Sequence, residues 1–151
     1  MQTALRSTVV PMTSTTGRAF VRLLEWDIST IKQYAVQKGL YTAEEIDAVE
    51  VEYKKYLALC IGYPKAALPT PLKFDDLWHQ HILFTQDYHA MCQSTCGRYI
   101  HHQPFVGDIR IDPNARVEMR AMYLREFGEQ PNAMWSVDGL CSPNPNCEGK
   151  S

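Results

Sequence analysis

The chain of 151 residues has no strong excess of either charge and no long apolar run. Its 15 Lys and Arg residues nearly balance its 17 Asp and Glu residues, which leaves a formal net charge of −2. Because a general nucleic-acid binder needs a basic face, this balance argues against nucleic-acid binding. No segment approaches the roughly 20 consecutive apolar residues of a membrane span, and the first residues show no secretory signal. We therefore expect no membrane partner and a cytoplasmic protein, in which thiols stay reduced.

The sequence also lacks the common catalytic motifs. It contains no Gly-x-Ser-x-Gly elbow, no phosphate-binding Gly-rich loop, no dinucleotide fingerprint and no His-Glu-x-x-His. Its five cysteines form neither a disulfide framework nor a complete zinc-binding pattern. Cys60, Cys92 and Cys96 have apolar helical surroundings and are interpreted first as buried thiols. Cys141 and Cys147 could close a small loop, bind a metal or remain free.

The spacing of apolar residues predicts an all-α protein, a single domain of four to five helices with short extended connections and a mobile C-terminal tail. Within 17–38 we expect two helical pieces separated near residues 27–30. Further helices are predicted over about 42–62, 72–96 and 113–127, with Gly97 ending the helix over 72–96. The predicted organisation is a loosely ordered leader at 1–16, a helical domain at 17–128 and a flexible, Cys-containing tail at 129–151.

All the histidines of the chain lie in one segment. They are His79, His81, His89, His101 and His102. Neutral imidazole is the commonest metal-ligating side chain, and the nearby carboxylates Asp75 and Asp76 could complete a set suited to iron, zinc or copper. This clustering is the most informative feature of the sequence.

Local geometry limits how these histidines can share an ion. Residues two apart on a helix point about 200° away from each other, so His79 and His81 cannot both bind one ion. His101 and His102 alternate faces if their segment is extended. A single ion can therefore receive at most one histidine from each pair.

Two alternative sites follow from the predicted helix. In the first, Asp75 and His79 at i,i+4 meet His101 or His102, a two-histidine, one-carboxylate set typical of non-haem iron. In the second, His81 ligates from the apolar face of the helix, with Tyr88 or Cys92. We favour the first site, because it provides charge balance and access to water.

Structural roles compete with both sites. His81 on an apolar stripe could be a core histidine with a hydrogen-bond partner. Asp75 and His79 could form only a helical ion pair, and His101 and His102 could lie in an exposed loop. His89 faces neither site and is predicted to lie on the surface.

Several short motifs of the chain resemble the glycine-rich domain-containing protein-like family. The similarity covers about residues 45–105 and centres on an Asp-x-x-Trp-His-x-His pattern followed by Tyr-x3-Cys, a glycine and a final histidine. The matching segments are Tyr53-Lys54-Lys55-Tyr56-Leu57, Leu68-Pro69-Thr70, Asp75-Asp76-Leu77-Trp78-His79-Gln80-His81, Tyr88, Cys92, Gly97 and His101-His102-Gln103-Pro104. The resemblance implies that the Asp-Trp-His-His residues belong to one site.

Together these observations predict a metal-binding helical protein, in its more specific form a metal-dependent enzyme. Iron-dependent oxidation and zinc-assisted hydrolysis are the two reaction classes considered, with copper ranked below iron and zinc. Trp78, Tyr88 and Cys92 are predicted to line the site, and a small molecule or peptide is the expected ligand. The alternative is a non-catalytic interaction module in which the Trp-His-x-His residues are structural. The oligomeric state is not predicted.

Overall fold

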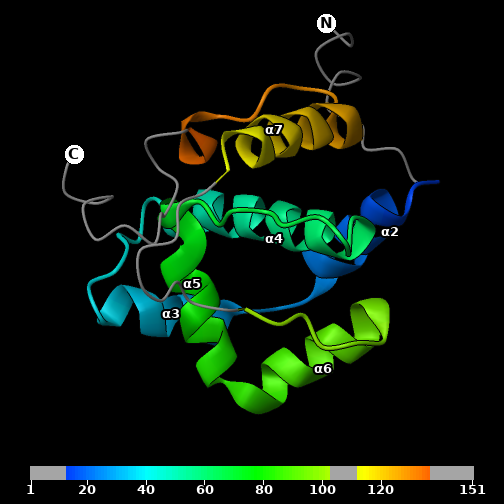
Figure 1. Ribbon diagram of the computed structural model, residues 1–151. Helices are drawn as coiled ribbons and strands as arrows, with labels where there is room; N and C mark the ends of the chain where they lie inside the picture. Colours follow the sequence, from blue (N-terminus) through cyan, green and yellow to red (C-terminus); the bar gives the residue numbers. More distant parts are fainter. Residues whose placement is uncertain (1–12, 103–111, 137–151) are drawn as a thin grey trace, which may run out of the picture.

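The computed structural model describes residues 13–102 and 112–136, and within these residues the protein is all-helical (Figure 1). The all-α prediction is therefore confirmed. No helix in the described part combines the length and the apolar character needed to cross a membrane. In chain order the elements are α2 (Thr15–Glu25), α3 (Ser29–Gln37), α4 (Ile46–Gly62), α5 (Leu72–Leu83), α6 (Thr85–Cys96), α7 (Pro113–Phe127) and the 3-10 helix η1 (Ala133–Trp135).

Helix α4 forms the centre of the molecule. Figure 1 shows it between α7 and α6, and both α2 and α5 pack against it. Val49, Tyr53 and Leu57 on α4 are fully buried. Helix α2 approaches α4 closely at Gly62, where an added Cβ would collide with the side chain of Thr16. The central helix can therefore supply core side chains to neighbours on several sides.

The predicted helix over residues 72–96 is instead two helices, which is why residues 13–102 and 112–136 contain six α-helices and not four to five. The break is at Phe84, whose backbone angles (φ −85°, ψ 72°) are not helical. In an unbroken helix, residues six apart differ by about 240° and face different sides. The change of direction at Phe84 instead brings Asp87 Oδ2 to 2.8 Å from His81 Nε2.

The ends of the helical domain also differ from the predicted boundaries. Helix α2 begins inside the predicted leader, with Ser14 Oγ accepting a hydrogen bond from the Gly17 N–H at 2.8 Å. Trp135 belongs to the predicted tail, yet it is buried to 1% exposure. The apolar contacts of its ring explain why the chain stays packed beyond α7. Cys141 and Cys147 lie outside the described residues.

Candidate metal centre

Helix α5 supplies two of the three side chains that converge at this site. Pro71 directly precedes α5, and its ring fixes the backbone angle φ where the helix begins. The Tyr41 hydroxyl donates to the Lys73 carbonyl oxygen (2.8 Å) and accepts from the Leu77 N–H (2.9 Å), two groups that pair with each other in a regular helix. Tyr41 therefore fixes the turn of α5 that carries Asp75.

The three candidate ligands are Asp75, His79 and His102. Their ligand atoms all lie within 4.8 Å of one another. His79 Nε2 is 3.3 Å from Asp75 Oδ2, and His102 Nε2 is 3.0 Å from Asp75 Oδ1. The two Nε2 atoms are 2.7 Å apart. Asp75 and His102 are mostly buried, whereas the side chain of His79 is 42% exposed, so the cluster opens toward solvent on the His79 side.

His102 reaches α5 because both main-chain groups of Ile100, its N–H and its carbonyl, are hydrogen-bonded to side chains of α6. Gly97 ends α6 in the left-handed conformation (φ 74°), which glycine adopts without strain. The Ile100 N–H then donates to Cys92 Sγ at 3.4 Å, and the Ile100 carbonyl accepts from the Tyr88 hydroxyl. These bonds direct the chain back across α5, where the ring of His102 lies beside Asp75.

Trp78 forms the floor beneath His102. The two rings are stacked, with centroids 3.9 Å apart and planes inclined by 15°. The Trp78 indole N–H donates to the Tyr88 hydroxyl at 2.9 Å. Tyr88 therefore links the tryptophan under His102 to the backbone that carries His102.

The geometry of the three ligand atoms suits a metal ion. For metal–ligand bonds of about 2.1 Å, neighbouring ligand atoms lie about 3.0 Å apart in octahedral and about 3.4 Å apart in tetrahedral coordination. Two of the separations at this site, 3.0 and 3.3 Å, fall in that range. The 2.7 Å between the imidazole nitrogens is shorter and is a hydrogen-bond distance between the two rings, so a bound ion would have to separate them slightly.

The environment of Asp75 Oδ1 is a second indication of a bound cation. This oxygen is buried and accepts no properly directed hydrogen bond in the described part of the chain, although His102 Nε2 is only 3.0 Å away. The short distance establishes proximity, and the direction of the N–H decides whether a hydrogen bond forms. A buried carboxylate oxygen without a donor is strongly disfavoured, and a cation between the three groups would satisfy it.

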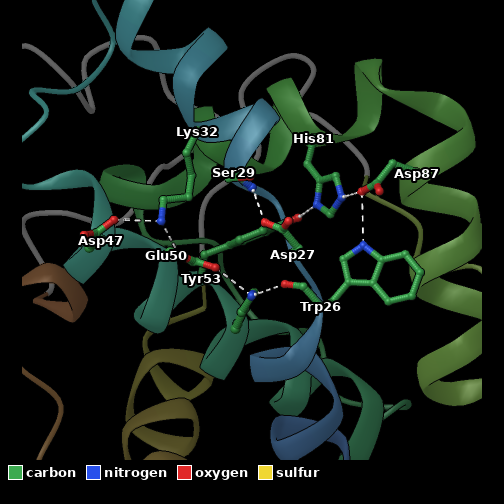
Figure 2. A network of polar contacts seen from close by, with 10 residues as sticks. Trp26, Asp27, Ser29, Lys32, Asp47, Glu50, Tyr53, His81 and Asp87 are labelled. Atoms are coloured by element: carbon green, nitrogen blue, oxygen red, sulfur yellow. Dashed lines mark hydrogen bonds and ion pairs between the residues drawn. The ribbon is translucent and has the colours of Figure 1, made fainter.

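A separate polar network surrounds His81. Its Nδ1 lies 2.7 Å from the Tyr53 hydroxyl and its Nε2 lies 2.8 Å from Asp87 Oδ2, which also accepts from the Trp26 indole N–H at 3.2 Å (Figure 2). His81 is fully buried, and this burial lowers its pKa, although Asp87 acts in the opposite direction. The network joins α4, α5 and α6 to the chain that follows α2.

A protein-family model with the description UCP032817-like matches residues 16–123. The chain belongs to the UCP032817-like family. The predicted membership of the glycine-rich domain-containing protein-like family is therefore wrong. No curated protein and no solved structure matches this UCP032817-like chain. The matched segment contains Asp75, His79 and His102.

In this UCP032817-like protein, the histidines separate as local geometry requires. His79 joins Asp75, while His81 lies in the network of Tyr53 and Asp87. His102 approaches Asp75, and the neighbouring His101 is exposed with its ring against Tyr99. Within the described residues, neither His81 nor Cys92 belongs to a group of three or more His, Cys, Asp or Glu side chains that could hold a metal ion.

The other candidate residues do not belong to the three-ligand cluster. Asp76 and His89 are exposed. Trp78, Tyr88 and Cys92 are buried and support His102 by stacking or by bonds to Ile100.

Sequence reasoning missed the roles of Tyr41, Tyr53 and Asp87. No sequence pattern indicated the contact of Asp87 with His81, because this contact depends on the break of the helix at Phe84. Tyr41 and Tyr53 are separated from α5 in sequence, and only the packing of the helices reveals their contacts. The choice of His102 over His101 did have a signal. Ile100 is apolar and buried, and in an extended segment residue 102 lies on the same side as residue 100.

Proposed function

We propose that Asp75, His79 and His102 bind a divalent metal ion, iron(II) or zinc. The observation that carries this proposal is the convergence of a carboxylate and two imidazole Nε2 atoms from separate segments of the chain. Two histidines and one carboxylate are typical ligands of non-haem iron, and the same donor types bind zinc. The charge also fits, because a single carboxylate partly balances a divalent cation and the imidazoles bind it in their neutral form.

A purely structural role explains this cluster less well. An isolated i,i+4 ion pair between Asp75 and His79 would need no third partner. Here the Nε2 atoms of His79 and His102 point into the same space at 2.7 Å, and Asp75 Oδ1 lacks a directed donor. A bound cation would accept a lone pair from each of the three groups at once.

Three protein ligands leave coordination positions for water or substrate, as metal-dependent enzymes require. A bound metal there would act as a Lewis acid or, for iron, in oxidation. The chain's own contribution is positional. Trp78 covers one face of His102, Asp75 places one carboxylate oxygen beside each imidazole, and the exposed His79 leaves the site accessible from solvent.

The second candidate is a non-catalytic interaction module in which the Trp-His-x-His residues are structural. The hydrogen bonds of Trp78 and of His81 favour this role for those two side chains. They provide no reason for His79 and His102 to face each other, so the metal site remains the better proposal.

The test is the metal content of protein purified without an affinity tag, measured by elemental mass spectrometry before and after anaerobic reconstitution with iron(II) or zinc. Wild-type protein should bind about one ion per chain. Because each variant lacks one ligand, His79→Ala and His102→Ala should weaken binding by more than about 100-fold, beyond the effect of losing a supporting residue.

His89→Ala and His101→Ala are matched controls, because both histidines are exposed and lie outside the cluster. Both control variants should bind metal as the wild type does. Circular dichroism would establish that all four variants keep their helices. If the wild type takes up no metal, or if all four variants bind it equally, the proposed site is wrong.

A further inference from the structure

A cavity of about 680 Å³ lies against the candidate metal centre. Its wall includes His102 and Trp78, so the cavity and the metal cluster share a side chain and the ring stacked on it. Small-molecule sites typically enclose about 300–1,000 Å³. The cavity is therefore large enough for a small substrate placed next to a metal held by His102.

Most of the cavity wall is apolar or aromatic. The connection between α4 and α5 provides Pro64, Ala66, Ala67, Leu68 and Pro69, and aromatic rings come from other segments. Two of the polar groups in the wall are already paired, because the Tyr56 hydroxyl bonds to the Leu68 carbonyl and to Thr70 Oγ1. This part of the wall suits the apolar body of a ligand and offers it few polar contacts.

Arg98 is the only lysine or arginine among the described residues of the wall. Its guanidinium makes two hydrogen bonds of 3.4 Å, to the carbonyl oxygens of Cys60 and Ile61, and no carboxylate of the described residues lies within ion-pair distance. Among the described residues of that wall, the one carboxylate is Asp112, which accepts from the Asn114 N–H at the start of α7. Arg98 therefore retains N–H donors for an external anion.

Arg98 and His102 are four positions apart in the chain, and both line this cavity. A small molecule in the cavity can therefore contact both residues. Planar guanidinium groups pair best with planar, bidentate carboxylates.

We propose that the cavity binds a small carboxylic acid with an apolar body, whose carboxylate pairs with Arg98 and whose body lies toward His102. As the substrate class of the metal centre, this inference rests on the proposed function. The binding itself depends on Arg98 and the apolar wall, and so it can be measured with or without metal.

The probes are 3-phenylpropionate and its neutral amide, which have nearly the same size and shape. Ligand-observed NMR titrations would give the Kd of each for the full chain, with zinc bound and after chelation. The acid should bind the wild type more tightly than the amide. Arg98→Gln should weaken binding of the acid by about 10- to 100-fold, the effect of losing a hydrogen-bonded charge pair, and should leave the amide unchanged.

Arg22→Gln is a matched control, because Arg22 also donates to a main-chain carbonyl, that of Thr95 at 3.3 Å, but does not line this cavity. A second pair of variants tests the location. Ala67→Trp should fill the cavity and abolish binding of the acid, whereas Ala121→Trp, at an exposed position on α7, should not.

The outcomes separate the two proposals. If zinc-loaded protein binds the acid and the amide equally, or if Arg98→Gln and Arg22→Gln have the same effect, the carboxylate site is wrong while the metal centre stands. If the chain takes up no metal but binds the acid through Arg98, the metal centre is wrong and the carboxylate site is supported.

Discussion

At the scale of single residues, all three tryptophans of the chain act as polar anchors as well as apolar bulk. Trp26 donates its indole N–H to Asp87, Trp78 to Tyr88, and Trp135 to Glu52. A buried indole N–H without a partner is disfavoured, so each of these rings has a defined orientation and not only a defined position. Since Trp78 stacks on His102, its orientation directly affects the candidate metal centre.

The stability of the fold should decrease at acidic pH because of His81. Burial lowers the pKa of His81 in the folded protein from its ordinary value of 6.5. Below that value the unfolded chain binds a proton that the folded protein does not yet accept. The free energy of unfolding should therefore fall as the pH decreases through about 6.5 toward the lower pKa of the folded state.

Urea unfolding between about pH 8 and about pH 5, with a chelator present, measures this dependence. His81→Gln should show a smaller decrease toward acid, because it removes the titrating ring. His89→Gln is the control, since His89 is exposed and should leave the wild-type profile unchanged. An identical pH profile in all three proteins would contradict a role for buried His81.

At the scale of elements, the segment Gly97–His102 is held by the Tyr88 hydroxyl together with the bond from the Ile100 N–H to Cys92 Sγ. Tyr88 accepts from Trp78 and donates to the Ile100 carbonyl, so Tyr88→Phe would leave two buried polar groups without partners. We expect a loss of about 1–3 kcal/mol in unfolding free energy. Metal affinity should also fall by about 10- to 100-fold, because the residue that orients a ligand is removed.

Tyr99→Phe is the matched control for this element. Tyr99 packs against Tyr88 (5.2 Å between centroids), but its hydroxyl makes no hydrogen bond within the described residues. Denaturation and metal titration of both variants would show whether the hydroxyl of Tyr88 matters. Equal effects of the two substitutions would mean that His102 is held by packing alone.

The helices that could be predicted from sequence are those whose signals are local. Thr42 and Glu45 form the reciprocal hydrogen bonds of a capping box, and Gly97 adopts the left-handed conformation at the end of α6. The same kind of local geometry pairs Asp75 with His79 one turn apart. Contacts of this range depend on spacing alone, so a single sequence contains them.

The parts that could not be predicted depend on tertiary packing. Nothing around Phe84 is a proline or glycine, yet the helix breaks there and Asp87 turns toward His81 and Trp26. The approach of His102 to α5 likewise depends on bonds between Ile100 and α6. In both cases the partner is distant in the sequence or reached only after a change of direction.

At the scale of the whole molecule, α7 and η1 are attached to α4 through buried polar groups. Glu52 Oε1 accepts from the Tyr123 hydroxyl at 3.0 Å and from the Trp135 indole N–H at 2.7 Å. Lys55 Nζ donates to the same Tyr123 hydroxyl at 2.8 Å and lies 3.6 Å from Glu52 Oε2. Because a buried charge is stable only when it is paired, each member of this group depends on the others.

Trp135 connects this attachment to the metal centre. Its ring packs on Phe74 of α5, with centroids 5.2 Å apart, and Phe74 directly precedes Asp75 in the chain. Trp135→Ala should lower the free energy of unfolding by about 3–5 kcal/mol, since it empties a large site and removes a donor from buried Glu52. Trp135→Phe keeps most of the ring but loses the indole N–H, so it should lower the unfolding free energy by about 1–3 kcal/mol.

Urea denaturation followed by far-UV circular dichroism measures these losses, and Val117→Ala is the control because Val117 is 67% exposed on α7. The control should change stability by no more than about 0.5 kcal/mol. A chain ending at residue 128, before η1, should be destabilised as much as Trp135→Ala and should bind metal more weakly, because α5 loses its support at Phe74. If that shortened chain kept wild-type stability and metal affinity, η1 would be a surface attachment and the site would depend on α5, α6 and the segment to His102 alone.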